Sequence, residues 1–264
     1  MKNQTLKFYP GLDIKPITNP MGFEYGQDCL GPKVEYRTLD SIRKSLLDPD
    51  CSGPDPVYSI AMGVGKERHK QLLLERNLLF GVVTYAKGRL GNEPVRSQGH
   101  IHKKTRNNTM SPPEVYEIWL GKAIIYMQET ANDNPGRCFA VEACPGEVVI
   151  VPPDWAHATI SADPNEPLTF GAWCDRDFGF EYNRVRAHKG LAWFPIINKT
   201  GEIDWITNDN YQPTRLHRKQ PELYQSLGIK KGIPIYSIFE EDPDAFLYVS
   251  QPQDKFEIWQ NFIP

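Results

Sequence analysis

The sequence predicts an all-β protein, and two observations support this fold class. Between about residues 72 and 176, apolar and β-branched runs recur roughly every 8 to 12 residues, with no helical pattern between them. The 264-residue chain also contains 23 prolines and 20 glycines, which favour short strands and turns over long helices. Together these features indicate an antiparallel sandwich or barrel.

The predicted strands follow one another closely in this central region. The clearest of them, 79–85, is followed by turn signals at Gly88 and Gly91. Tight connections are expected at Gly121-Lys122 and at 132–136. Further strands are expected at 96–103, 115–120, 123–128, 137–143, 147–151, 156–161 and 168–174.

The segments on either side are less regular. A helix is expected at 38–47, where leucine and isoleucine side chains fall on one face; Thr38 or Asp40 could cap its start. The proline-rich first 35 residues are expected to wrap the core and to add one or two strands. Near the C-terminus the pattern predicts strands at 193–197, 233–239 and 246–249 and a short helix at 221–227.

These segments are interpreted as one domain covering residues 1–264. An N-terminal extension (1–71) and a C-terminal outer layer (186–264) flank a barrel core (72–185). No internal repeat or low-complexity segment divides the chain.

Composition excludes several function classes. The formal net charge of −3 gives no basic surface for nucleic acid or for an anionic membrane. No apolar run reaches the roughly 18 residues needed to cross a bilayer, and the first residues lack the apolar segment of a secretory signal. The five cysteines contain no C-x-x-C pair and are expected to be reduced and mostly buried. We therefore expect a cytoplasmic protein without nucleic-acid or membrane partners.

Three histidines and a glutamate form the main candidate site. His100 and His102 are two residues apart in a predicted strand, so their side chains point to the same face. Glu114 and His157, on neighbouring predicted strands, could complete an N₃O set for a divalent first-row metal. The remaining histidines have no such companions and are expected to be structural or at the surface: His69, His188 and His217.

The surroundings of this site resemble the cupin superfamily. The end of the first cupin motif, E-x₆-G, matches Glu114 and Gly121, which favours Glu114 over the nearby Glu117 as the ligand. The second motif, G-x₅-P-x-G-x₂-H-x₃-N, is met at Gly146, Pro152 and His157. The resemblance implies a cupin double-stranded β-helix (a jelly-roll barrel) with N-terminal and C-terminal extensions and a few short helices.

The chain departs from the cupin motifs in several places. The opening glycine of the first motif is displaced, Asp154 stands where the second motif has glycine, and Ser161 stands where it has asparagine. Eleven residues, 103–113, separate His102 from Glu114, where the motif has three or four. This polar, basic insert is expected to be an extended hairpin loop near the site, either a mobile lid or a solvated surface loop.

Within the cupins, the sequence resembles the cupin-type glucose-6-phosphate isomerases of archaea and some bacteria. The likeness covers roughly residues 75 to 185 and rests on the following matches: Thr84, Gly88, Gly91, Glu93, Ser97-Gln98-Gly99-His100-Ile101-His102, Glu114-Val115-Tyr116 and Pro152-Pro153-Asp154-Trp155-Ala156-His157. It implies one divalent ion per chain, with Fe²⁺ first and Mn²⁺, Zn²⁺ or Ni²⁺ as alternatives. It also implies a sugar-phosphate substrate and a homodimer.

The resemblance also implies roles for individual residues. The metal ligands would be His100, His102, Glu114 and His157. Glu114 would move the proton between C1 and C2 of the open-chain sugar, assisted by Tyr116 or Tyr182, and a metal-assisted hydride shift is the competing mechanism. The substrate and its phosphate would be bound by Thr84, Ser97, Gly99, Tyr116 and Tyr182. Phe180 replaces a histidine that faces the sugar in this family.

Two other functions remain open at this point. A cupin dioxygenase can use the same His₃Glu set to hold iron, so the ligands alone do not discriminate. A non-catalytic sugar-binding cupin is the third possibility, although a binding module has no need of all four ligands. Ser97 and Tyr182 favour a sugar phosphate, whereas Phe180 counts against it. The sugar itself, including mannose 6-phosphate, is also open.

Overall fold

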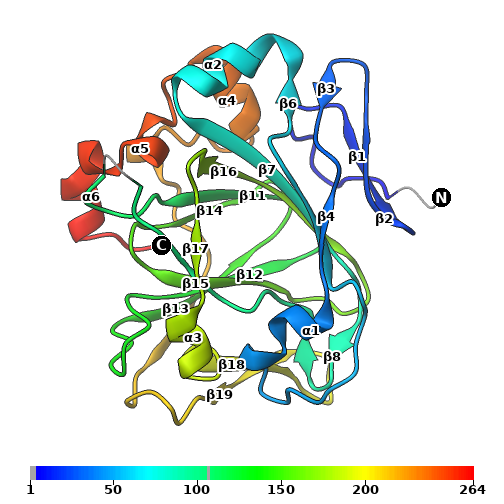
Figure 1. The fold of residues 1–264 in the computed structure, drawn as a ribbon, viewed down its shortest axis with the longest axis vertical. Coiled ribbons are helices and arrows are strands. Elements are labelled where there is room, and N and C mark those ends of the chain that lie inside the picture. The colour runs from blue at the N-terminus through cyan, green and yellow to red at the C-terminus, as the bar shows by residue number, and fades with distance from the viewer. Residues whose placement is uncertain (1–3, 106–107) are drawn as a thin grey trace.

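Two facing sheets form the centre of the molecule (Figure 1). The computed structural model describes residues 4–105 and 108–264. The larger sheet has the strand order β14 (Val148–Val151), β11 (Glu114–Leu120), β16 (Leu168–Asp175), β7 (Leu78–Tyr85), β5 (Tyr58–Met62) and β4 (Glu35–Arg37). The smaller sheet has the order β15 (Ala156–Ser161), β12 (Ala123–Gln128), β13 (Cys138–Ala143) and β20 (Leu216–Lys219).

These strands confirm the all-β prediction and form the two facing sheets of a jelly-roll barrel. All the pairs in the two sheets are antiparallel except β13 with β20. The predicted bounds 123–128 and 156–161 agree with β12 and β15 to the residue, and β11, β13, β14 and β16 begin or end within one residue of their predicted limits. The pattern of short apolar segments separated by polar turns therefore predicted the core strands correctly.

The predicted strand 96–103 is only partly regular. Isolated bridges pair Arg96 with Ile160 and His100 with His157, so this segment runs beside β15 at the edge of the smaller sheet. Its last two residues form β10 (Ile101–His102), which pairs with β17 (Phe180–Glu181). The segment therefore brings both histidines of the H-x-H pair to the edge of the barrel.

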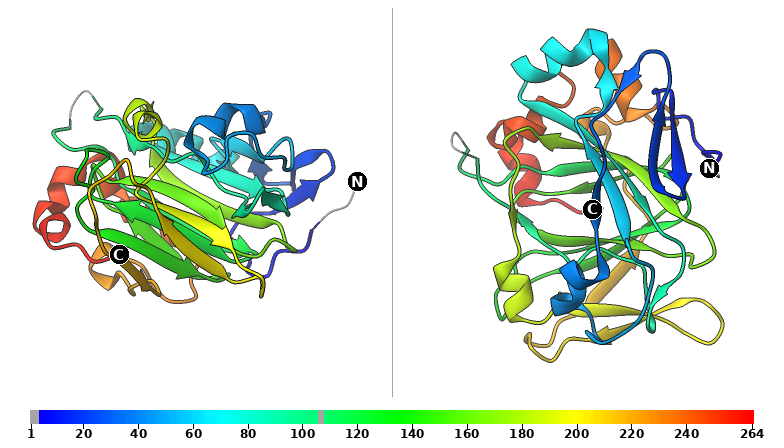
Figure 2. Two further views of the ribbon diagram at one scale, coloured as in Figure 1. Left: turned by 90° about the horizontal axis from the view of Figure 1, so that it is seen from below. Right: turned by 45° about the vertical axis from the view of Figure 1, so that its right-hand side comes forward.

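The core lies partly between the sheets and partly outside the larger one. Between the sheets, Tyr116, Ile118 and Phe170 pack with side chains of β12 and β13. On the outer face of the larger sheet, Trp119 and Trp173 are fully buried. This outer face is covered by a C-terminal layer that contains α4 (Ile235–Glu241), α5 (Leu247–Ser250) and α6 (Phe256–Gln260). The N-terminal strands and the helices α5 and α6 lie on opposite sides of the molecule (Figure 2).

The strands predicted at 233–239 and 246–249 are wrong, because these segments are the helices α4 and α5. Ile235, Ile238 and Phe239 have helical spacing and are all buried against the larger sheet. A short apolar run fits a buried helix and a buried strand equally well, and only the neighbouring sheet decides between them. The helix predicted at 221–227 is a single 3₁₀ turn, η3 (Gln225–Leu227).

The early helix is present but shorter than predicted. It consists of α1 (Leu39–Ile42) and the 3₁₀ turn η1 (Arg43–Ser45). Thr38 caps its start, because its hydroxyl oxygen accepts a hydrogen bond from the Ser41 N–H at 3.3 Å. Leu47 lies beyond the helix and is 41% exposed. The first 35 residues were expected to add one or two strands and contain three: β1 (Ile14–Thr18), β2 (Met21–Tyr25) and β3 (Cys29–Leu30).

The remaining elements are short and connect or border the sheets. Strand β18 (Trp193–Ile197) confirms its prediction and pairs with β19 (Ile203–Thr207). The other strands are β6 (Gly65–Lys66), β8 (Arg89–Leu90) and β9 (Glu93–Pro94), and the other helices are α2 (Lys70–Glu75), α3 (Asn183–Ala187), η2 (Glu67–His69) and η4 (Pro252–Lys255). All five cysteines are free and four of them are buried, as expected. Among the described residues, no helix is long and apolar enough to span a membrane.

The junction between the larger sheet and the C-terminal layer contains a buried carboxyl group. Glu117 accepts hydrogen bonds from Trp119 Nε1 and from the Ile235 N–H, both at 2.8 Å. Burial raises the pKa of Glu117 to about 8, although both hydrogen bonds act to lower it. The folded protein thus keeps a proton at neutral pH that the unfolded chain, with the ordinary pKa near 4.5, has released.

This difference predicts how stability changes with pH. Because the folded state binds more protons than the unfolded state between about pH 4.5 and pH 8, the free energy of unfolding should fall as pH rises through this window. In Glu117→Gln that contribution is absent, so urea unfolding should show a weaker loss of stability with rising pH than in the wild type. Parallel pH profiles for the two proteins would contradict the assignment of this slope to Glu117.

Candidate metal centre

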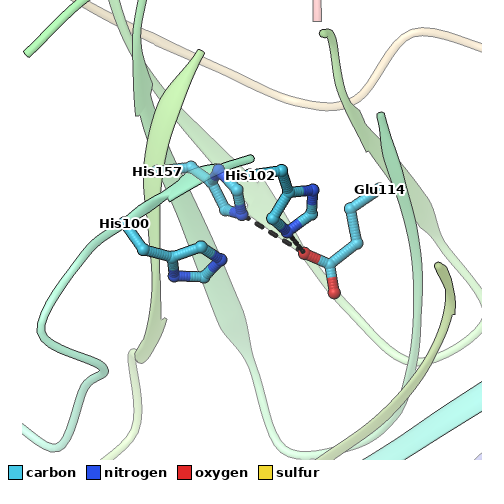
Figure 3. A group of neighbouring side chains, drawn as sticks. All are labelled: His100, His102, Glu114 and His157. Atoms are coloured by element: carbon cyan, nitrogen blue, oxygen red, sulfur yellow. Dashed lines mark hydrogen bonds and ion pairs between the residues drawn. The ribbon is translucent and has the colours of Figure 1, made fainter. Parts of the chain in front are cut away.

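The four predicted ligands lie together in the structure (Figure 3). His100, His102 and His157 come from the edge of the smaller sheet, and Glu114 begins strand β11 of the larger sheet. One ligand atom from each of the four residues lies within 4.8 Å of the others. The site therefore joins the two sheets across the barrel. It is the only cluster of three or more potential ligands among residues 4–105 and 108–264.

Hydrogen bonds behind two of the histidines fix which nitrogen faces the site. His102 Nδ1 lies 3.0 Å from the Pro112 carbonyl oxygen, and His157 Nδ1 lies 3.2 Å from the Trp155 carbonyl oxygen. A carbonyl oxygen only accepts, so both Nδ1 atoms carry a proton, and in the neutral form of each ring Nε2 presents a lone pair. This arrangement is typical of histidines that bind a metal through Nε2.

The same two Nε2 atoms converge on one carboxylate oxygen. Each lies 3.2 Å from Glu114 Oε2. In their neutral forms, lone pairs would face a buried negative oxygen, and a cation between them would remove that repulsion. The buried His100 Nε2 has no hydrogen-bond partner among the described residues. The cluster thus fits a divalent ion, both by its donor set and by this unpaired nitrogen.

The electrostatics of the cluster favour the charged carboxylate. Burial acts to raise the pKa of Glu114, but hydrogen bonds and charges from His102 and His157 hold it well below its usual range. Burial lowers the pKa of His100 and of His157, so their neutral, ligand-ready forms predominate at neutral pH. The pKa of His102 is raised, because its contact with Glu114 outweighs the opposing effect of burial.

The carboxylate of Glu114 has two different environments at its two oxygens. The Tyr116 hydroxyl donates to Oε2 at 2.6 Å, on the side of the two imidazoles. The other oxygen, Oε1, lies 3.4 Å from the Cys174 sulfur. Burial and the charge of Glu114 raise the pKa of Tyr116 well above its usual range, so its hydroxyl remains a proton donor.

A cavity of the barrel opens onto these residues. Of the predicted site residues, five line it: Ser97, His100, Glu114, Tyr116 and Tyr182; Phe180, which replaces the family's histidine, lines it as well. The Phe180 ring packs 4.5 Å from the His100 ring and 5.9 Å from the Tyr182 ring, measured between centroids. The position that holds histidine in the resembled family is thus filled here by an apolar wall next to a metal ligand.

Two predicted substrate contacts are not at the cavity. Thr84 has the parity of Val82, which faces the C-terminal layer, and its hydroxyl pairs with Thr169 at 3.0 Å. Gly99 has a left-handed backbone (φ +86°), and a Cβ there would lie 2.8 Å from Leu191. Leu191 therefore packs where a side chain on residue 99 would lie. Neither Thr84 nor Gly99 is among the residues that line the cavity, and their roles as substrate contacts stay predictions.

Residues that should point away from the cavity do so in the structure. Glu117 and Trp119 lie on the outer face of the larger sheet. Arg96 is also directed away from the cavity, but it is buried, with its guanidinium 2.6 Å from Glu93 and bonded to the Ser45 carbonyl. The three remaining histidines are outside the cluster: His69, His188 and His217.

Nine further residues line the cavity that the sequence did not single out as site residues: Arg37, Tyr58, Ile60, Met62, Val83, Tyr85, Gln98, Thr159 and Phe170. Arg37 and Tyr58 lie on β4 and β5, two strands that the sequence analysis missed. Tyr85 directly follows Thr84, so the correct strand parity would have selected it. Gln98 lies inside the matched S-x-G-H-x-H segment, next to Ser97, and this position could have identified it as a cavity residue.

The insert between His102 and Glu114 was predicted to be an extended hairpin loop, and part of it, residues 106–107, lies outside the described residues. Its described residues, 103–105 and 108–113, contain no strand; the insert follows β10 and precedes β11 of the larger sheet. Its end is fixed by two hydrogen bonds between Ser111 and Asp154, of 3.0 and 2.7 Å. Asp154 has φ +66°, a conformation that aspartate tolerates, which explains its place where the motif has glycine.

The geometry predicts metal binding that can be measured without any activity. The wild-type protein should retain one divalent ion per chain after equilibrium dialysis, and His157→Ala should bind it more than about 10-fold more weakly because one of four ligands is lost. His217→Ala, which removes an exposed histidine outside the cluster, is the matched control. Equal metal content in all three proteins would place the ion elsewhere.

Comparison with known proteins identifies the family. The family model described as "Glucose-6-phosphate isomerase (GPI)" matches residues 45–214. A glucose-6-phosphate isomerase of Thermococcus litoralis is 31% identical over 183 residues, which are 67% of this chain and 86% of that protein. That of Pyrococcus horikoshii is 29% identical over 203 residues, 75% of this chain and 98% of that protein.

Solved structures give weaker similarities. Oxalate oxidase in complex with glycolate matches with a TM-score of 0.32 and 14% identity over 40% of this chain and 46% of that chain. A deletion mutant of Bacillus subtilis oxalate decarboxylase matches with a TM-score of 0.33 and 14% identity, over 58% of this chain and 31% of that chain. The match of the family model, which covers more than half of the residues, is decisive: the chain belongs to the glucose-6-phosphate isomerase family.

Proposed function

We propose that this protein is a metal-dependent aldose–ketose isomerase that interconverts glucose 6-phosphate and fructose 6-phosphate. One observation carries the proposal: a chain of this family places His100, His102, Glu114 and His157 around one point, at the wall of a cavity. Family membership favours isomerisation over the dioxygenase and over the non-catalytic sugar-binding protein, which the ligand set alone leaves open.

The metal ligands in this proposal are the four clustered side chains. Three imidazoles and one carboxylate suit iron(II), which we propose as the native ion, and they also suit manganese, zinc and nickel. When bound, the ion supplies Lewis-acid stabilisation of the negative charge that develops on the sugar oxygens. Iron content of the protein purified without oxygen is the direct test of the choice of metal.

Glu114 is proposed to carry the proton between C1 and C2. Its Oε2 atom already meets two imidazoles and the Tyr116 hydroxyl, whereas Oε1 faces only the weak donor of Cys174 among the interactions described here. We therefore assign proton transfer to Oε1, so that one carboxylate can serve as ligand and base through different oxygens. Tyr116, held protonated, would stabilise the charged carboxylate and orient it.

The sugar side of the cavity is assigned to hydroxyl groups. Ser97 and Tyr182 line the cavity and are proposed to bind the sugar hydroxyls, while Phe180 excludes water beside His100. Phenylalanine cannot transfer a proton, so this chain has no second proton relay at that position. The open-chain form of the substrate is therefore expected to enter the site with ring opening completed in solution or assisted by Tyr182.

We also propose that the protein acts in the cytoplasm as a homodimer. Five free cysteines, four of them buried, are typical of a reducing compartment. The homodimer is inferred from the family resemblance alone. Light scattering on the metal-loaded protein gives the mass in solution, and a monomer would contradict this part of the proposal.

Activity without oxygen separates the isomerase from an oxygen-using cupin. The metal-loaded protein should convert fructose 6-phosphate to glucose 6-phosphate anaerobically, chelation should abolish the conversion, and adding back a divalent ion should restore it. Activity that survives complete metal removal would contradict the metal mechanism. A protein that binds one ion per chain but acts only with oxygen would be a dioxygenase.

Replacing the proposed base tests the proton-transfer step. Glu114→Gln should lower kcat about 100-fold or more, because an amide accepts no proton at neutral pH. Glu142→Gln, on β13 outside the cavity, is the matched control and should keep wild-type activity.

In D₂O the wild-type reaction should place deuterium on at least part of the product. Product with no deuterium would instead indicate a hydride shift.

A further inference from the structure

We propose that Arg37 binds the phosphate group of the substrate and thereby selects phosphorylated sugars. The inference rests on the function proposed above and names a residue outside the region that the family model matches. Arg37 lies N-terminal to the residues matched by the family model, 45–214. It reaches the cavity from β4, the edge strand of the larger sheet.

The charge of the cavity points to Arg37. Among the described residues that line the cavity, it is the only lysine or arginine. A dianionic phosphate favours a cation in its binding site, and Arg37 is the cationic side chain that this described lining offers. The sites first expected for the phosphate do not provide one: Thr84 faces the opposite side of β7, and Leu191 fills the space beside Gly99.

The present partner of Arg37 holds it weakly. Its guanidinium pairs with Glu35 at 3.2 Å, and the Glu35 side chain is 68% exposed. Exposed ion pairs of this kind contribute little free energy and are screened by salt. The Arg37 side chain, only 27% exposed, can therefore exchange this carboxylate for a phosphate without a large cost. Arginine presents a planar fork of donors that matches phosphate oxygens.

Neutral donors surround the guanidinium. Arg37 is paired with Tyr58 across β4 and β5, and its charge acts on the hydroxyls of Tyr58 and Tyr182, where it opposes the rise in pKa caused by burial. Gln98 accepts a hydrogen bond from Arg186 Nε at 3.0 Å through its amide oxygen. Because arginine only donates, this contact leaves the Gln98 amide N–H₂ as a donor. One cation with hydroxyl and amide donors forms a site for a phosphate group.

The test compares three variants with phosphorylated and unphosphorylated substrate. Arg37→Gln should raise KM for fructose 6-phosphate about 10- to 100-fold, the effect of losing hydrogen bonds to a charged group, with a smaller change in kcat. Arg37→Lys keeps the charge but loses the planar fork of donors, so its KM should lie between those of the wild type and Arg37→Gln. For unphosphorylated fructose, wild type and Arg37→Gln should have equal kcat/KM. Glu35→Gln, which frees Arg37, should leave KM equal or lower.

A binding measurement gives a readout besides activity. Inorganic phosphate should bind the metal-loaded wild type by calorimetry, and Arg37→Gln should weaken this binding by a similar factor. Arg89→Gln removes an exposed arginine outside the cavity and is the control for net charge. If the wild type is active but Arg37→Gln keeps its KM and its affinity for phosphate, the role of Arg37 is wrong and the isomerase stands. A wild type without isomerase activity overturns the proposed function itself.

Discussion

The meeting of Glu114 with three imidazoles is the constraint on which the barrel centre depends. His102 and His157 each place Nε2 3.2 Å from Glu114 Oε2, and both are locked in this orientation by backbone carbonyls. A carboxylate buried in this way is costly unless positive charge compensates it. Because the histidines and the glutamate come from different sheets, a bound cation would also tie the sheets together, so metal affinity and stability are coupled.

Much of the fold could be predicted from local sequence. Strands β12 and β15 agree with their predicted bounds to the residue, because β12 is an apolar run and β15 alternates apolar with polar residues. The segments of α4 and α5 were predicted as strands, since a short apolar run fits either element, and only packing against the tryptophans of the larger sheet shows that they are helices. Strands β4 and β5 were missed because they are short, although they contribute to the cavity lining.

The site was predictable where spacing defines it and not where packing does. The H-x-H pair, Glu114 and His157 were found because motif spacing and strand parity agree on one point. Parity alone does not say which face of β7 lines the barrel, and Thr84 lies on the outer face, where it pairs with Thr169. The missing Cβ of Gly99 makes room for Leu191, a residue about ninety positions away in the chain, and sequence spacing does not reveal this contact. Contacts between distant segments thus decide the substrate side of the cavity.

Residues inside and outside the region matched by the family model meet in this cavity. Phe180 gives it an apolar wall, and Arg37 brings a cation from outside the matched region. The most direct measurement is a crystal structure of the manganese-loaded protein with fructose 6-phosphate, using anomalous scattering to locate the ion. We predict one anomalous peak bound by His100, His102, Glu114 and His157, with the sugar in the cavity beside it. An ion or a sugar bound at another place would contradict the account.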